Sequence, residues 1–287
     1  MMLNHINEQI LSMVKSKGRK FMLKSIITLL LVCWMFAATF ATAQNLNQPF
    51  QATFYTDLRV YTWEEFDDNG AQNLSETGSL FGFGVVPKIA LDDSKNFFLK
   101  GDFTMYFASV GYNGFTFDQQ GNQTAFTTNT NYFGFEMMPE LGYNFALSKE
   151  FDLTPITGPG FEHWSRGING GNAPGYTENY SVILWDITAE GTYKVDKDIQ
   201  IIPWFGLRFP FSFSESVDLS QDQGPSDISL SPGTSPRIRF GLDGNIYRAF
   251  ASISFETWSI GKSPQDQNYL QPNSSRKIFI IKVGYTI

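Results

Sequence analysis

Hydrophobic and polar residues alternate with a period of two along several long segments of this chain. In Ile199–Phe213, for example, Phe205, Leu207 and Phe209 share one face of an extended strand, whereas Arg208 lies on the other. Such alternation is typical of strands that place one face in an apolar environment and the other in a polar one. The pattern therefore predicts an all-β protein.

Ten segments show this alternation strongly enough to be predicted as strands. They are much longer than the strands of a typical globular sheet, which have about 5–6 residues, and long enough to cross a bilayer when tilted. A secreted β-sandwich and a soluble lipocalin-like barrel also alternate, but strand length favours the membrane. The predicted strands are Phe50–Trp63, Ser79–Leu91, Phe97–Tyr112, Tyr132–Leu147, Phe151–Ser165, Thr177–Val195, Ile199–Phe213, Arg237–Tyr247, Ala249–Ile260 and Lys277–Ile287.

The predicted connections alternate between short and long. An outer-membrane barrel has this arrangement, with both termini and the short turns in the periplasm and the long loops outside the cell. We therefore expect a single closed antiparallel up-and-down transmembrane β-barrel of about ten strands. The long polar connections are Glu64–Gly78, Asn113–Asn131, Arg166–Tyr176, Ser214–Pro236 and Gly261–Arg276.

The N-terminal segment has the features of a cleaved signal peptide. Basic residues between Lys15 and Lys24 precede the apolar run Ser25–Phe40, and Ala41-Thr42-Ala43 supplies the small residues that precede a cleavage site. The apolar run spans only about 24 Å as a helix, less than the roughly 30 Å hydrocarbon core, which argues against an uncleaved anchor. We expect a signal peptide over residues 1–43, with Met22 as an alternative start, and a barrel domain over residues 44–287.

Composition excludes several classes of chemistry. Cys33 is the only cysteine and lies in the predicted signal peptide, so the mature chain has neither a disulfide nor a cysteine nucleophile. A net charge of −7 argues against binding nucleic acid, whose phosphates would be repelled. Aromatic residues make up 16% of the chain, as expected where one face of each strand meets lipid.

Aromatic residues near the strand ends suggest girdles at the two membrane interfaces, where amphipathic rings gather. The last strand, with Phe279, Ile281, Val283 and Tyr285 on one face, resembles the C-terminal assembly signature of bacterial outer-membrane β-barrel proteins, although the chain ends in Ile287. This resemblance implies insertion into the outer membrane by the barrel-assembly machinery. The residues assigned to the girdles are Tyr61, Trp63, Tyr112, Tyr132, Trp164, Tyr193, Tyr247, Trp258 and Tyr285.

The faces opposite the oily rows carry charges of both signs, which we expect to point into the lumen. Opposite charges in a confined space pair with each other, because each is costly to desolvate alone. A barrel of about eight strands is filled by its side chains and one of 16–18 leaves a channel, so ten strands favour a filled lumen. The predicted lumen charges are Asp57, Arg59, Lys88, Lys100, Asp102, Glu136, Glu140, Asp186, Glu190, Lys194, Arg208, Arg237, Arg239, Asp243, Glu256 and Lys282.

Prolines interrupt the predicted strand Phe151–Ser165. Pro155 and Pro159 remove two backbone donors within the run Pro155–Gly160, so we expect a β-bulge there.

A possible catalytic group follows this run. His163, the only histidine of the mature chain, and Ser165 share a face, and Asn179 or Glu178 on the next strand could orient the ring. The arrangement resembles the outer-membrane phospholipase family and, more loosely, the lipid A deacylases, which use His-x-Ser on a lipid-facing strand. The resemblance implies Ser165 as nucleophile and His163 as base; the alternative is a histidine that anchors the chain at the interface.

Other chemistry has less support. Omptin-type outer-membrane proteases need an Asp-x-His pair, but Phe161 stands at that spacing before His163. Asp67-Asp68-Asn69-Gly70 could bind calcium, but its spacing is not that of an EF-hand and a solvated turn is the favoured interpretation. We expect neither a cofactor nor a metal.

The first hypothesis from the sequence is a non-enzymatic outer-membrane barrel. Its lumen is filled by a network of paired charges, and the barrel presents long loops at the surface. A narrow porin-like channel for ions or small solutes is the alternative, and a lipid hydrolase is the third. The expected partners are outer-membrane lipid, the assembly machinery during insertion, and an extracellular ligand of unknown identity at the loops.

Overall fold

The computed structural model describes residues 50–117, 123–170, 175–219, 228–266 and 269–287. The predicted signal peptide lies outside these residues. No helix in the described part of the chain is long and apolar enough to span a membrane.

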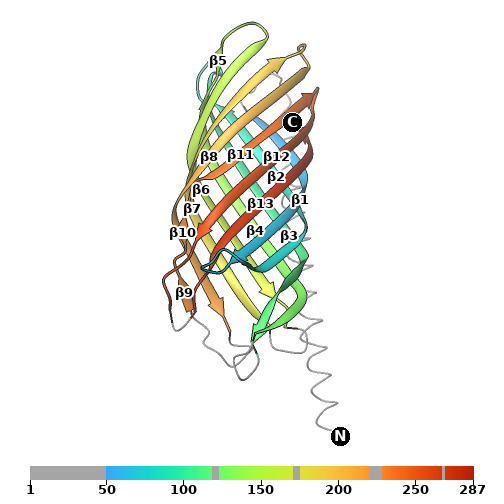
Figure 1. Ribbon diagram of the computed structural model, residues 1–287. Coiled ribbons are helices and arrows are strands. Elements are labelled where there is room, and N and C mark those ends of the chain that lie inside the picture. Colours follow the sequence, from blue (N-terminus) through green and yellow to red (C-terminus); the bar gives the residue numbers. More distant parts are fainter. Residues whose placement is uncertain (1–49, 118–122, 171–174, 220–227, 267–268) are drawn as a thin grey trace, which may run out of the picture. The chain divides into compact units, whose positions relative to one another are not determined.

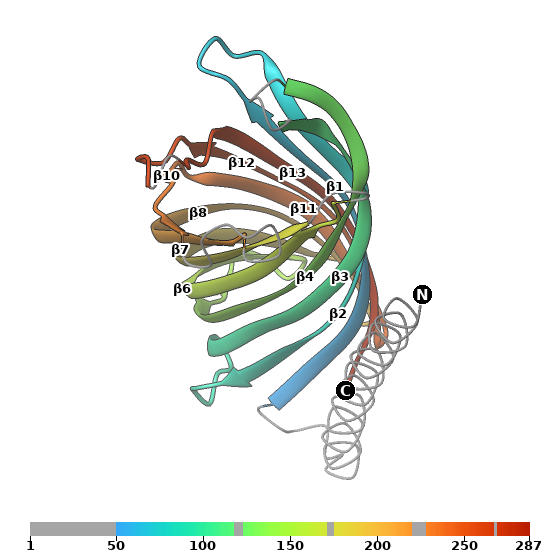
Figure 2. The ribbon, with the colours of Figure 1, turned by 90° about the horizontal axis from the view of Figure 1, so that it is seen from below.

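The described residues form one antiparallel sheet that closes on itself. Each long strand pairs with the next along the chain, and β13 pairs with both β12 and β1, so the sheet has no free edge. Figure 1 shows the strands running obliquely in alternating directions, and Figure 2 shows how they curve. The long strands are β1 (Phe50–Phe66), β2 (Gln72–Ala90), β3 (Phe97–Phe117), β4 (Gln123–Tyr143), β6 (Phe151–Ile168), β7 (Tyr176–Lys194), β8 (Ile199–Asp218), β11 (Arg237–Ile246), β12 (Ala249–Gly261) and β13 (Asn273–Thr286).

The predicted ten-stranded up-and-down barrel is confirmed. Three short strands complete the sheet: β5 pairs with β6, β9 with β8, and β10 with β12. They are β5 (Phe145–Ala146), β9 (Ile228–Leu230) and β10 (Gly233–Thr234).

Several strands extend further from the turn end than the sequence predicted. β2 begins at Gln72, β8 continues to Asp218 and β13 begins at Asn273, all within segments predicted as loops. The strand ends continue the inward–outward alternation, but their outward residues are polar, so an alternation of apolar and polar residues does not mark these ends in the sequence. Where they are described, the bases of these connections are therefore paired strand ends.

A belt of apolar side chains covers the outside of the barrel. Phe81 is 56% exposed and Ile187 is 51% exposed, values unusual for an aqueous surface but expected of a surface that faces hydrocarbon. We call these outward residues the apolar belt; they include Val60, Phe81, Phe107, Phe133, Ile183, Ile187, Phe205, Phe240, Ile253 and Phe279.

The belt ends abruptly at a row of polar residues. On β1, Thr62 is the next outward residue after Val60. On β7, which runs in the opposite direction, Ser181 is the next outward residue beyond Ile183 at the same end of the barrel. We call this row the polar collar: Thr62, Ser79, Ser109, Asn131, His163, Ser181, Ser214, Thr257 and Lys277.

The inside of the barrel changes character at about the same level. Along β1, the charged Asp57 and Arg59 face inward where the belt covers the outside, whereas Trp63 faces inward beyond Thr62. Along β1, therefore, the inward side chains change from charged to aromatic where the outward ones change from apolar to polar.

The expected interfacial girdle is wrong for the aromatic residues of the outer half. Tyr61, Trp63, Tyr132 and Trp164 are at most 3% exposed and lie inside the barrel, because they share the inward parity of the lumen charges. Tyr112 and Trp258 are buried in the same way. Tyr193, Tyr247 and Tyr285, at the turn end, are exposed.

The expected bulge in Phe151–Ser165 is also wrong. β6 keeps one register with β7 throughout, and its register with β4 is the same on both sides of a gap in pairing opposite Pro139. Gly158 instead allows β6 to approach β4 closely, since a Cβ there would lie 2.7 Å from the Cα of Glu140. Register shifts occur elsewhere, between Ile183 and Leu184 of β7 where it pairs with β8, and between Glu65 and Phe66 of β1 where it pairs with β2.

Candidate functional site

A layer of paired charges crosses the lumen at the middle of the barrel. Arg59 on β1 donates to Asp57 at 3.0 Å and to Glu136 on β4 at 2.9 Å. Arg208 on β8 lies 3.2 Å from Glu136 and 3.1 Å from Glu256 on β12. Because Arg59 and Arg208 share Glu136, this ion layer links strands on different sides of the barrel.

Further predicted charges pair near this layer. Arg208 and Arg239 both reach Asp186, at 3.2 and 3.3 Å, and Asp186 is fully buried. Arg237 lies 3.5 Å from Glu256. These short contacts compensate for desolvation, since a buried charge without a partner would be strongly destabilising.

Nearer the turns the ion pairs are more solvent-exposed. Lys100 and Glu190 lie 2.9 Å apart, and Lys282 lies 3.3 Å from Asp102. Lys194 pairs at 2.7 Å with Asp152, a residue that was not singled out in the sequence.

Three predicted lumen residues have no ion pair within the described part of the chain. Lys88 places its ammonium 3.8 Å from the centre of the Phe98 ring. Asp243 accepts hydrogen bonds from Trp204 at 3.0 Å and Ser252 at 2.7 Å. Glu140, only 6% exposed, has neither an ion pair nor a hydrogen bond among these residues.

A central acceptor of the lumen lies outside the set of charges predicted from the sequence. Glu162 on β6 is 1% exposed and receives Arg237 at 2.5 Å and Arg276 at 2.7 Å. Its inward parity, adjacent to the outward Phe161, could have identified it. Arg276 was assigned to a loop and therefore overlooked.

A second group of buried charges, outside the predicted set, lies nearer to the end of the barrel with the long connections. Arg166 is fully buried and lies 3.1 Å from both Glu65 and Glu76 and 2.6 Å from Glu178. Most of these residues belong to strand ends predicted as loops, where lumen-facing parity was not considered. Glu178 therefore pairs with Arg166 inside the barrel, on the face opposite His163.

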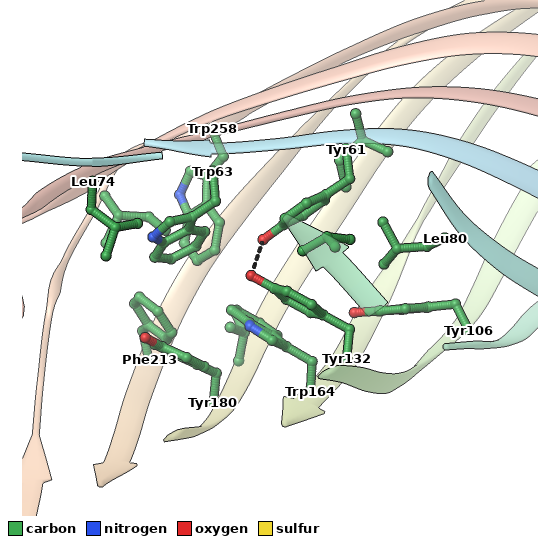
Figure 3. Close-up of a cluster of buried hydrophobic side chains, with 14 of the residues drawn as sticks. Tyr61, Trp63, Leu74, Leu80, Tyr106, Tyr132, Trp164, Tyr180, Phe213 and Trp258 are labelled. Carbon is green, nitrogen blue, oxygen red and sulfur yellow. Dashed lines mark hydrogen bonds between the residues drawn. The ribbon is translucent and has the colours of Figure 1, made fainter. Parts of the chain in front are cut away.

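Buried aromatic residues fill the lumen beyond the ion layer. We define the aromatic plug as Tyr61, Trp63, Tyr132, Trp164, Tyr180, Phe213 and Trp258, which belong to one buried cluster (Figure 3). The rings of Trp164 and Tyr180 stack 4.7 Å apart at an angle of 10°. Trp63 and Tyr180 are 0% exposed and Trp164 is 1% exposed.

The ion layer and the aromatic plug are in direct contact. The Arg237 guanidinium lies 3.8 Å from the Trp258 ring centre, and that of Arg276 lies 5.0 Å from the Trp164 ring. Such cation–π contacts are stabilising where both partners are desolvated.

Two described residues of the connection between β12 and β13 lie beside the plug. Ser263 and Gln271 are 5% and 3% exposed, and the Ser263 amide donates to the Gln271 carbonyl at 2.9 Å. The Tyr180 hydroxyl lies 3.3 Å from the Gln271 side-chain amide. This connection thus packs against the outer side of the plug.

The turn side of the lumen is hollow. A cavity of about 500 Å³ is bounded at one end by Lys197, Asp198 and Tyr247 of the turns, and at the other by Arg59 and Glu136 of the ion layer. We call this cavity the vestibule.

The possible catalytic group is assembled differently from the expectation. His163, Ser165 and Asn179 all lie outward, and Ser165 is paired in register with Asn179. The His163 Nδ1 atom, however, hydrogen-bonds Ser181 Oγ at 2.9 Å, and no bond joins it to Ser165 among the described residues. The His-x-Ser pair is therefore not engaged as the resemblance implied.

The candidate calcium turn is satisfied by its own backbone. Asp67 Oδ1 accepts from the amides of Asn69 and Ala71 at 2.8 Å, and Asp68 pairs with Lys262. Among the described residues, no cluster of three or more His, Cys, Asp or Glu side chains could hold a metal ion.

A closed antiparallel barrel with an oily exterior and a charged interior defines the class of bacterial outer-membrane β-barrels. The predicted outer-membrane location agrees with this fold and with the solved structures that resemble it. Neither a protein-family model nor a curated protein matches the sequence.

Among solved structures, the outer membrane protease OmpT from Escherichia coli is similar, with a TM-score of 0.56 and 9% identity over 84% of this chain and 98% of OmpT. The translocator domain of the autotransporter NalP from Neisseria meningitidis has a TM-score of 0.46 and 11% identity, covering 89% of this chain and 94% of that domain. A major outer membrane protein from Thermus thermophilus has a TM-score of 0.38 and 13% identity, covering 81% and 99%. At these identities the likeness concerns the fold alone.

Proposed function

We propose that this protein is a non-enzymatic outer-membrane barrel with a closed lumen, which holds a rigid set of hairpins at the cell surface for recognition or envelope stability. The observation that carries the proposal is the aromatic plug. Trp63, Trp164 and Tyr180 have almost no solvent-accessible surface, although they lie where a channel would need water.

The ion layer supports the same function. Ions crossing the lumen would have to displace Arg59 and Arg208 from Glu136, whose contacts are 2.9 and 3.2 Å long. Separating buried pairs of this kind is strongly unfavourable, because each charge is left uncompensated. Two successive barriers therefore oppose conduction.

The hairpins beyond the polar collar are the surface that remains for a partner. They continue the barrel strands, as in β1–β2, where pairing extends to Phe66 and Gln72. A surface built on paired strands loses less conformational entropy on binding than a mobile loop. An extracellular ligand is therefore expected to meet a preformed surface.

Planar-bilayer recording tests the closed lumen. The purified barrel should insert without producing stable single-channel steps, while a porin recorded under the same conditions provides the positive control. Reproducible steps of uniform size that scale with protein concentration would disprove the proposal.

A narrow channel is the second candidate function, and the vestibule is the observation that favours it. It already hollows out the turn half of the lumen, so a channel would require only that the plug and ion layer move aside. The same recording separates the two functions, provided that it includes high membrane voltages, at which a gated channel should show transient openings.

A further inference from the structure

The vestibule is lined by one acidic and one basic side chain, Glu140 and Lys88, that form no ion pair within the described part of the chain. The Lys88 ammonium lies 3.8 Å from the centre of the Phe98 ring, and the buried Glu140 carboxylate has no hydrogen-bond partner among the described residues. Both side chains line the cavity. Most other lumen charges have a partner at short distance, so these two groups are available to a ligand.

The two groups lie at a defined separation. Lys88 pairs in register with Lys100 on the neighbouring strand, and Lys100 pairs with Glu140 on the next. Two interstrand spacings place the Lys88 and Glu140 backbones roughly 10 Å apart. Lys100, between them, is engaged by Glu190 at 2.9 Å.

The wall as a whole selects against a ligand of single charge. It carries acidic and basic residues in nearly equal numbers, so a simple anion or cation would meet repulsion from part of the surface. The acids are Asp102, Glu136, Glu140, Asp152, Glu190, Asp198, Asp243 and Glu256, and the bases are Arg59, Lys88, Lys100, Lys197, Arg208, Arg239 and Lys282.

We propose that the vestibule is a binding site, entered from the periplasmic side, for a small zwitterion of the size of a di- or tripeptide with free termini. The ligand carboxylate binds Lys88 and the ligand ammonium binds Glu140. An extended chain advances about 3.3–3.6 Å per residue, so two or three residues match the roughly 10 Å between the Lys88 and Glu140 backbones.

The size and lining of the cavity suit such a ligand. Its volume of about 500 Å³ lies within the range of about 300–1,000 Å³ that is usual for small-molecule sites. Tyr55, Phe98, Trp204 and Phe250 supply apolar wall between the charges. The ion layer closes the inner end, so the cavity is suited to retaining a ligand.

Titration calorimetry on the barrel folded in detergent tests the site, with triglycine as the probe. N-acetyl-triglycine lacks the free ammonium and triglycine amide lacks the carboxylate, so each should bind at least about tenfold more weakly, the loss expected for one charge-assisted hydrogen bond. Glu140→Gln should weaken triglycine to a similar extent but leave N-acetyl-triglycine unaffected. Lys88→Met should weaken triglycine but leave triglycine amide unaffected.

The Glu64→Gln variant is the matched control. It removes one negative charge from the pair of Glu64 with Lys277, which lies outside the vestibule. Each variant is first checked for the heat-dependent gel migration of a folded barrel. Absence of saturable triglycine binding to the folded wild-type barrel would overturn the proposal. Equal binding of all three probes, or variants that weaken all three equally, would overturn it as well. The test does not depend on whether the lumen conducts ions.

Discussion

Replacing Glu162 by glutamine should destabilise the barrel strongly, because this carboxylate holds two buried arginines. Its oxygens lie 2.5 Å from Arg237 and 2.7 Å from Arg276, and all three side chains are at most 3% exposed. Glutamine keeps the volume but loses the charge and turns an amide donor toward guanidinium donors.

The magnitude follows from what remains after the exchange. Removing one partner of a buried ion pair costs about 3–5 kcal/mol. Glu256 still lies 2.8 Å from Arg276 and 3.5 Å from Arg237, so partial compensation places the expected loss near the lower end, about 3 kcal/mol.

Equilibrium unfolding in urea, followed by tryptophan fluorescence of the barrel in lipid vesicles, measures this loss. Glu64→Gln is the control, since its 2.9 Å pair with the half-exposed Lys277 should contribute only about 0.2–1 kcal/mol. A double-mutant cycle of Glu162→Gln with Arg276→Met should give a coupling of about 1–3 kcal/mol. Equal losses for Glu162→Gln and Glu64→Gln would refute the view that the lumen charges stabilise the barrel.

Two further predictions concern the close strand contact and the orientation of the barrel. Gly158→Ala should destabilise the folded barrel by roughly 1–3 kcal/mol, since its Cβ would lie 2.7 Å from the Glu140 Cα. Gly111→Ala should be tolerated, because the nearest neighbour of its Cβ would be 3.7 Å away. Similar unfolding midpoints for the two variants would contradict this prediction. In intact cells, a membrane-impermeant maleimide should label an Asp68→Cys protein, in the β1–β2 turn, but not a Lys95→Cys protein, in the β2–β3 turn, because only the first turn is expected outside the cell. The only native cysteine lies in the predicted signal peptide, so background labelling should be low. The reverse labelling would show that the barrel has the opposite orientation.

The strands, their order and the orientation of their faces could be predicted from sequence because each depends on local information. A period of two determines which residues share a face of a strand, and the gaps between alternating segments indicate where the turns lie. β6 shows the limit of this reasoning. Its prolines indicated a bulge, but the decisive contact is the close approach of Gly158 to β4, which depends on a residue distant in the chain.

The pairing inside the lumen could not be predicted for the same reason. The alternation placed Arg59 and Glu136 in the interior, but they are 77 positions apart in the sequence, and no local pattern indicates that they meet across the barrel. The aromatic plug was misjudged because Trp63 and Trp164 were assigned by their nearness to strand ends, while their parity already pointed inward.

The polar collar also determines how deep the molecule sits in its bilayer. A shift of two residues along a strand corresponds to about 6.6 Å of travel along that strand. Sinking by that amount would carry Ser181 and Asn131 into hydrocarbon, and rising would expose Phe81 and Ile183 to water. Since either displacement is opposed around the circumference, lipids of different chain length should deform around this barrel before the barrel changes its depth.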